Sequence, residues 1–241
     1  MKTSTKRVRF AGSSVRQGAP RLLRAISDQS NERSATAEAF SHFSKGLELI
    51  GELPDDLATH ELELPLRVGF GGAASAIEGY SAQGIEKNYT RMLVLAGTLN
   101  RPRERFRAHL GLSAFYEVGG DIEKSQLHCE QCLRSAELSG DRDELLHAHR
   151  LMGELSFFKG EFEASCGHFE TVLPLYETRD HLRLIRALGD DPAVLSRVFK
   201  AMSLWFLGFP DQAKESCRLG MELADRHRHA FSSAQADFYA A

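Results

Sequence analysis

Three short stretches share the pattern that decides the fold class: GDIEKS at residues 120–125, GEFEAS at 160–165 and GFPDQA at 208–213. In each stretch a glycine is followed within three positions by an acidic residue and, at the fifth position, by a small residue. We expect the glycine to end one helix in a left-handed conformation, which costs glycine little because it lacks a Cβ atom. The next helix then begins at once, and Pro210 is tolerated there because a first-turn N–H has no intrahelical partner. The pattern predicts a series of helix–turn–helix hairpins.

Aligning the chain on Gly120, Gly160 and Gly208 shows similar residues at fixed offsets. Offsets of five, nine and twelve place each set on one helical face, since the members are separated by four and three positions. The sets are Ser125, Cys129 and Cys132; Ser165, Phe169 and Val172; Ala213, Cys217 and Gly220; and two weaker copies, Ala39, Phe43 and Gly46, and Asn88, Met92 and Leu95. Seven positions before the glycine stand Ser113, Gly153 and Ala201, with Ala76 in an earlier copy. Small residues that recur at one position indicate that two helices approach closely there.

Helix breakers and caps then bound the expected elements. Asp121 and Asp141 are the expected N-caps, and Pro102 and Pro192 mark two further helix starts. We expect helices at 33–51, 56–77, 83–98, 102–118, 121–139, 142–158, 161–177, 192–207, 210–227 and 229–241, with a longer connection containing a short helix at 177–191. The sequence therefore predicts an all-α solenoid of antiparallel helix hairpins, with a repeat of roughly 40 residues.

Composition excludes several classes of protein. The chain has 241 residues, 42% of them hydrophobic, and a net charge of −3, so no global field draws it toward nucleic acid. No apolar run approaches the length of a membrane span. Four unevenly placed cysteines do not suggest a disulfide framework, which favours a reducing compartment and a cytoplasmic location.

The segment 1–32 differs from the rest of the chain. Seven lysines and arginines stand there against Asp28 and Glu32 alone. We expect a basic, disordered tail or a misplaced start of the reading frame, with an organellar transit peptide as the alternative. The helical repeats are expected to occupy residues 33–241 and to end inside a repeat, which leaves an uncapped end through which copies could self-associate.

The turn pattern, the small residues of the first helix and the apolar second helix resemble tetratricopeptide repeats. More narrowly, residues 33–241 are similar to the helical-repeat region of bacterial adenylate/guanylate cyclase–ATPase fusion proteins. The motifs that carry this resemblance are RSA at 33–35, AEA at 37–39, GLEL at 46–49, GEL at 153–155, GEF at 160–162, Gly189 with Asp191 and Pro192, and above all LWFLGFPDQA at 204–213. The resemblance implies a regulatory or partner-binding region rather than the catalytic part of such proteins.

No motif for nucleotide chemistry accompanies the resemblance. A phosphate-binding loop needs a lysine after its glycines, and the cluster Gly69-Phe70-Gly71-Gly72 has none. We interpret this cluster as a flexible break within or after a helix.

The cysteines, histidines and tryptophan that could form a metal, redox or binding site also have simpler structural interpretations. Cys129 and Cys132 supply two thiols, whereas a structural zinc site uses four ligands, so core packing is the preferred interpretation and metal or redox chemistry the alternative. Each His-x-His pair, 147/149 and 227/229, points in opposite directions on a regular helix, so surface or partly buried histidines are expected. Trp205 is expected to pack between helices, with a role as a peptide anchor as the alternative.

The function expected from the sequence is that of a scaffold without catalytic residues, metal or cofactor. Its concave face, formed by the first helix of each hairpin, would bind a protein or peptide segment. The candidate contacts are Arg105, Arg107, Tyr116, His149, Arg150, Arg197 and Lys200. A detached remnant of a larger cyclase–ATPase protein and an enzyme on a helical array are the two alternatives.

Overall fold

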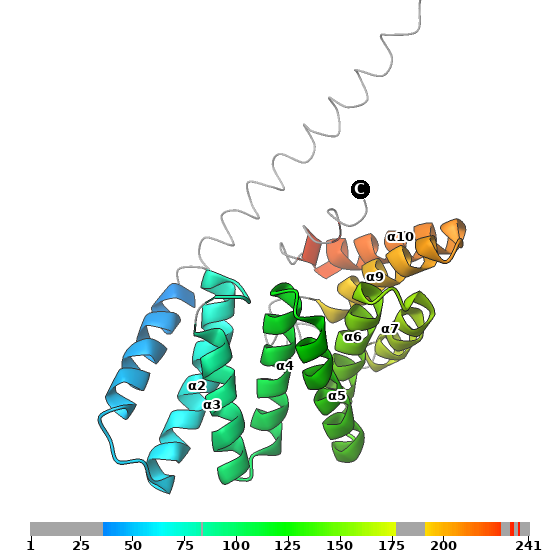
Figure 1. Cartoon of the computed structure of the whole chain (residues 1–241). Coiled ribbons are helices and arrows are strands. Elements are labelled where there is room, and N and C mark those ends of the chain that lie inside the picture. Colours follow the sequence, from blue (N-terminus) through cyan, green and yellow to red (C-terminus); the bar gives the residue numbers. More distant parts are fainter. Residues whose placement is uncertain (1–35, 83, 177–190, 228–231, 234–235, 237–241) are drawn as a thin grey trace, which may run out of the picture.

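The computed structural model describes residues 36–82, 84–176, 191–227, 232–233 and 236. This part of the chain is helical and contains no strand (Figure 1). A first helix covers residues 36–50, followed by α2 (Leu57–Glu78), α3 (Ile85–Thr98), α4 (Pro102–Val118), α5 (Ile122–Ser139), α6 (Arg142–Phe158), α7 (Phe162–Tyr176), α9 (Pro192–Phe206) and α10 (Pro210–His227). The expected all-helical character is confirmed, and the bounds of α2 to α10 lie within one or two positions of the expected ones. The basic tail, most of the 177–191 connection and most of the expected helix at 229–241 lie outside the described residues.

The three turn glycines adopt the expected left-handed conformation. The φ angles are 78° at Gly120, 78° at Gly160 and 84° at Gly208. After Gly120, the N–H of Asp121 donates to the carbonyl oxygen of Tyr116 at 2.9 Å, and the other two turns repeat this bond. These bonds satisfy carbonyl groups that a helix end would otherwise leave without a partner.

Two further turns follow the same rule without having been recognised in the sequence. Asn100 has a φ of 53°, and the N–H of Arg101 after it donates to the carbonyl oxygen of Ala96 at 2.8 Å. Gly140 has a φ of 63° and ends α5. Asparagine tolerates the left-handed region better than most residues. The chain therefore turns at positions 100, 120, 140 and 160, and this even spacing makes α4–α5 and α6–α7 two equivalent hairpins.

Helices pack against their neighbours in chain order (Figure 1). Each described helix from α2 to α7 contacts the next, α7 contacts α9, and α9 contacts α10. In addition, α2 contacts α4, α4 contacts α6, and α6 contacts α9. These second-neighbour contacts place α2, α4, α6 and α9 in one layer, and the face of that layer is where the sequence-predicted binding residues were expected.

The aligned small residues mark close helix contacts, as expected. Ser125 and Ser165 are fully buried, and their hydroxyl groups donate to the carbonyl oxygens of Ser113 at 3.1 Å and of Gly153 at 2.9 Å. A Cβ atom on Gly153 would lie 2.6 Å from the ring of Phe169. Only glycine therefore allows α6 and α7 to approach this closely.

Two other aligned positions behave differently. Ala76 is exposed, so its assignment to the buried small-residue position was wrong, and Gly71, Ala73 and Ala74 form the buried face of α2 instead. Cys217 is only partly buried, because the neighbouring Ser216 takes the inner position on α10.

The glycine cluster of residues 69–72 is not a break. It lies inside the continuous helix α2, and its glycines make room for aromatic rings. A Cβ atom on Gly69 would overlap the ring of Phe43, and one on Gly71 would lie 2.8 Å from the ring of Tyr89. The same Tyr89 ring also occupies the space that a Cβ on Gly111 of α4 would need. The interpretation as a flexible break was wrong because it considered only local backbone freedom.

Within the described part of the chain, no helix combines the length and the apolar character needed to span a lipid bilayer.

Candidate functional site

The candidate residues of α4 differ in their availability. Arg105 and Arg107 are exposed. Tyr116 is partly buried, donates its hydroxyl hydrogen to Glu86 of α3, and stacks on the ring of His128 with the ring centroids 5.6 Å apart. The bond to Glu86 and burial raise the pKa of Tyr116 to about 12. Tyr116 therefore holds α3, α4 and α5 together, while the two arginines remain at the surface.

The candidate residues of α6 point largely into the protein. Arg150 is buried and pairs with the buried Glu154 at 2.6 Å, so its assignment to a binding face was wrong. A helical position that appears polar in sequence is here part of the interior because it finds a carboxylate one turn away. His149 is partly buried, and its Nδ1 atom lies 3.0 Å from Nδ1 of His168 on α7.

The two candidates of α9 are partly buried. Lys200 forms an ion pair with Glu170 of α7 at 2.8 Å. The backbone carbonyl of Arg197 accepts a hydrogen bond from the hydroxyl of Ser216 on α10. Among the seven candidates, Arg105 and Arg107 are exposed, Arg150 is buried, and the other four are partly buried.

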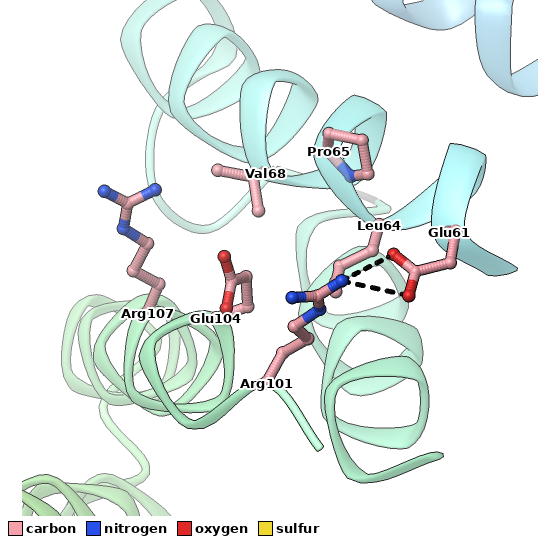
Figure 2. Close-up of a pocket in the computed structure, with 7 residues that line it drawn as sticks. All are labelled: Glu61, Leu64, Pro65, Val68, Arg101, Glu104 and Arg107. Carbon is pink, nitrogen blue, oxygen red and sulfur yellow. Dashed lines mark hydrogen bonds and ion pairs between the residues drawn. The ribbon is translucent and has the colours of Figure 1, made fainter. Parts of the chain in front are cut away.

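A shallow groove lies between α2 and α4, on the side where Arg107 is exposed (Figure 2). Its volume is about 300 Å³, and it is lined by Glu61, Leu64, Pro65, Val68, Arg101, Glu104 and Arg107. Arg101 donates to both carboxylate oxygens of Glu61, at 3.0 and 2.9 Å. Two arginines and two glutamates balance in charge, so this groove favours neither an anion nor a cation.

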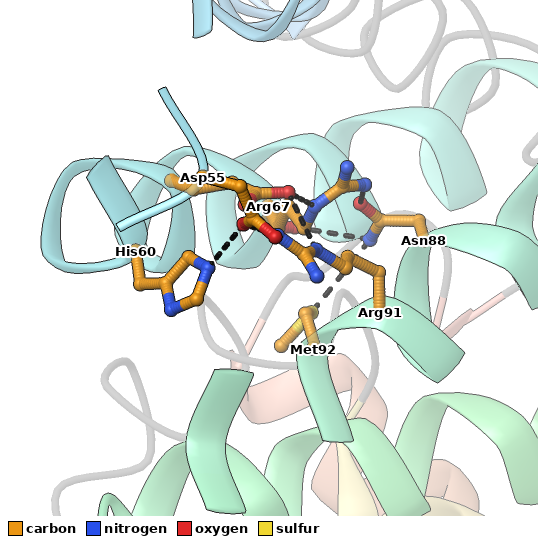
Figure 3. Close-up of polar contacts among 7 residues, drawn as sticks. Asp55, His60, Arg67, Asn88, Arg91 and Met92 are labelled. Carbon is orange, nitrogen blue, oxygen red and sulfur yellow. Dashed lines mark hydrogen bonds and ion pairs between the residues drawn. The ribbon is translucent and has the colours of Figure 1, made fainter. Parts of the chain in front are cut away.

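Beside the groove, a polar network joins α2 to α3 (Figure 3). The carboxylate of Glu63 is buried and accepts hydrogen bonds from Arg67 at 2.5 Å and from Arg91 at 2.8 Å. The side-chain amide of Asn88 donates to the backbone carbonyl of Arg67. Burial alone would raise the pKa of Glu63, but the bonds from Arg91 and Arg67 outweigh it and hold the pKa below its ordinary value. The charges satisfy one another, and the network stabilises the contact between the two helices.

The two cysteines of the Cys-x-x-Cys motif are core residues. Cys129 and Cys132 are fully buried against Phe106 of α4 and Leu151 and Leu155 of α6. Burial raises the pKa of Cys129 to about 12 and that of Cys132 well above the ordinary value. Among the described residues, no group of three or more metal-ligating side chains comes together. The packing interpretation is confirmed, because both side chains lie in the core among apolar neighbours.

Asp191 organises a second polar cluster at the ends of three helices. Its carboxylate caps the N-terminus of α9 and also accepts from the hydroxyl of Tyr176 at 2.8 Å. Nδ1 of His227, at the end of α10, lies 2.7 Å from the same carboxylate, and the hydroxyl oxygen of Ser232 accepts from the N–H of Asp191 at 2.9 Å. These contacts tie α7, α9 and α10 together.

The most unusual surface feature is aromatic. Phe158 and Phe162 lie at the α6–α7 turn, and Trp205, Phe206 and Phe209 lie at the α9–α10 turn; we call these five residues the aromatic surface. Trp205 is 62% exposed and Phe206 63% exposed. Phe162 and Phe206 stack with their centroids 4.7 Å apart, which joins the two turns. The expectation that Trp205 packs between helices was wrong, because its side chain is mostly exposed in the last turn of α9.

The residue two positions before a turn glycine is apolar in several hairpins. Val118, Phe158 and Phe206 each stand two positions before a turn glycine, and each is at least half exposed. Leu138 holds the same position before Gly140 and is 90% exposed, so this register carries an exposed apolar residue four times. A repeat alignment that included it would have pointed to these exposed positions, two of which are Phe158 and Phe206 of the aromatic surface.

No family model and no curated protein matches this chain.

Proposed function

We propose that the chain is a non-catalytic helical-repeat scaffold of the tetratricopeptide-like type, and that it binds an apolar segment of a partner protein at the aromatic surface. The observation that carries the proposal is the exposure of large aromatic side chains at two neighbouring turns. Trp205 and Phe206 are more than half exposed, and Phe158 and Phe209 are 50% and 49% exposed. Leaving this much aromatic area in water is unfavourable, and contiguous patches of this kind mark interaction sites in many proteins.

The rigidity of the surface supports a binding role. Phe157 lies beneath the exposed rings and contacts Phe158, Phe162, Phe199 and Phe206 edge-on or tilted. Phe158, Phe162 and Phe206 are therefore held in place by ring contacts, and a partner that binds them loses little conformational entropy. Tryptophan and tyrosine dominate the energetic centres of protein interfaces, which makes Trp205 the expected anchor.

The broader setting of the proposal comes from the sequence. The motifs of residues 33–241 support a relation to the helical-repeat regions of bacterial cyclase–ATPase proteins and a role in signal transduction. Three of the four cysteines are buried free thiols, which supports a reducing compartment such as the cytoplasm.

A peptide-display selection tests the proposal. The full chain is used to enrich binders from a random peptide library, and the affinity of each enriched peptide is measured for the wild type, Trp205→Ala and Phe206→Ala. Leu138→Ala is the matched control, because Leu138 is 90% exposed at the α5–α6 turn, outside the aromatic surface. We expect aliphatic or aromatic peptides whose affinity falls at least about tenfold in both aromatic variants and stays unchanged in the control.

Charge reversal distinguishes this surface from the face predicted by the sequence. Arg105→Glu and Arg107→Glu change the exposed charges of α4 and leave the aromatic surface intact. If the enriched peptides are acidic and lose affinity only in these two variants, binding occurs on the face of α4 and the aromatic-surface proposal is wrong.

A further inference from the structure

Two pairs of histidines occupy the same place in the two related hairpins. His109 of α4 faces His128 of α5, and His149 of α6 faces His168 of α7. Counted from the turn glycine of its own hairpin, each histidine of the second pair holds the same position as its counterpart in the first. The two Nδ1 atoms are 2.9 Å apart in the first pair and 3.0 Å apart in the second. Each pair therefore connects the two helices of its own hairpin through one hydrogen bond.

The two rings of each pair point their Nδ1 atoms toward each other. Their centroids are 5.2 Å apart in the first pair and 5.3 Å in the second, so the two Nδ1 atoms lie between the ring centres. Such an arrangement accommodates one hydrogen between the nitrogens, donated by one neutral imidazole to the lone pair of the other. When both rings are protonated, two N–H groups and two positive charges oppose each other, and the bond is lost.

The first pair has a positively charged surrounding. Arg105 of α4 and Arg134 of α5 act on His109, and α3 contributes Glu86, whose carboxylate is engaged by Tyr116. Burial lowers the pKa of His109 to about 4, with the partner imidazole and the two arginines acting in the same direction. Burial also lowers the pKa of His128. The second proton, which breaks the hydrogen bond by charging both rings, must therefore enter at His109 far below the ordinary pKa of histidine.

The second pair has a different electrostatic surrounding. Burial lowers the pKa of His149, but Glu137 of α5 faces it and opposes the shift. The pKa of His168 is lowered by burial and by the charge of His149. From α9, Lys200 approaches α7 and is paired there with Glu170. The carboxylate of Glu137 makes the first proton less costly here than between two arginines.

We propose that the two histidine pairs are pH-sensitive contacts. Each pair joins the two helices of its hairpin at neutral pH, and the hydrogen bond is lost on acidification in a fixed order, α6–α7 before α4–α5. The sign follows from proton linkage. Histidine titrates near 6.5 in an unfolded chain, and a pKa below that in the folded protein means that the unfolded state binds more protons. The contribution of the pairs to stability is therefore complete above about pH 6.5 and is lost as the pH falls toward the folded-state pKa. In this range each histidine lowers the folding equilibrium constant by up to about tenfold per pH unit.

Histidine NMR on the full wild-type chain tests the order directly. Each imidazole is followed by its nitrogen and carbon shifts between pH 7.5 and 4.5, in a buffer that contains a metal chelator. We expect His109 to titrate at lower pH than His149 and His168, and exchange of the α6–α7 amides to accelerate before that of the α4–α5 amides. Titration of all four at the ordinary histidine pKa, or the reverse order, would overturn the proposal.

Urea unfolding of variants provides the second readout. His168→Gln and His128→Gln each remove one titrating ring, and His42→Gln is the control because His42 is exposed on the first helix. We expect the free energy of unfolding to change less with pH between 7.5 and 5.5 in His168→Gln than in the wild type. The change should be reduced less in His128→Gln, and the control should keep the wild-type pH dependence. Equal dependence in all four proteins would contradict the proposal, whatever the absolute stability of the variants.

Discussion

The Tyr89 ring, enclosed by glycines of two neighbouring helices, leads to a quantitative prediction. A methyl group at Gly111 would overlap the ring, and the same ring also fills the space beside Gly71, where a Cβ atom would lie 2.8 Å from it. Overpacking of a core costs about 1–3 kcal/mol, and this site falls at the upper end because the ring cannot retreat. Alanine regains about 1 kcal/mol through its better helix propensity. We therefore expect Gly111→Ala to lower the free energy of unfolding by about 2 kcal/mol, and the melting temperature by about 4–8 °C.

Urea unfolding followed by circular dichroism measures this loss, and two further variants isolate its cause. In a Tyr89→Ala background the ring is absent, so Gly111→Ala should cost nothing or stabilise the protein. Gly72→Ala is the matched control, because Gly72 lies in the same helix as Gly71 but a Cβ there meets nothing within 4 Å; it should stabilise by up to about 1 kcal/mol. If Gly111→Ala is as stable as the wild type, or if its cost persists without the Tyr89 ring, the steric argument is refuted.

Three other predictions concern buried polar groups and thiols. Glu63→Gln should destabilise the protein by about 3 kcal/mol in urea unfolding, since it removes the buried charge that pairs with Arg67 and leaves Arg91 with its longer, exposed contact to Asp55; a loss below about 1 kcal/mol would show that the network contributes little. Burial and the charge of Glu154 raise the pKa of Glu117 to about 8, so the contribution of Glu117 to stability should fall as the pH rises from about 5 to 9, opposite in sign to that of the histidine pairs. The stability of Glu117→Gln relative to the wild type should therefore increase over this range, and a constant difference would contradict the assignment. A thiol reagent applied to the folded chain should modify the partly exposed Cys217 well before the buried Cys129, and mass spectrometry of timed samples would expose an opposite order.

Elements whose signals are local could be predicted well from the sequence. Gly120, Gly160 and Gly208 end their helices because the backbone needs a positive φ there, and this requirement is written into the residue type itself. The caps Asp121 and Asp141 accept bonds from N–H groups two or three positions away, so their role also depends only on neighbours in the chain. The turn at Asn100 was not predicted, because asparagine adopts the left-handed conformation less often than glycine does.

The surface residues were harder to predict because their exposure depends on elements far away in the chain. Arg150 and Trp205 have opposite hydropathy, yet the arginine is buried beside Glu154 and the tryptophan is exposed at a helix end. Neither outcome follows from helical periodicity, which identifies the face of a residue but not how far the neighbouring helix extends to cover it. The histidine pairs, likewise, require two helices to be placed side by side in a defined register.

The sequence alone therefore determined that the described part of the chain is helical, where α2 to α10 begin and end to within one or two positions, and that the hairpin that turns at Gly120 recurs around Gly160. These properties depend on interactions within about one helical turn, which the residue types specify directly. The tertiary structure alone decided that Gly69 and Gly71 make room for aromatic rings, that Arg150 is internal, and that five aromatic side chains lie at two neighbouring turns. Those properties depend on contacts between residues distant in the chain, where the shape of one helix sets the space available to another.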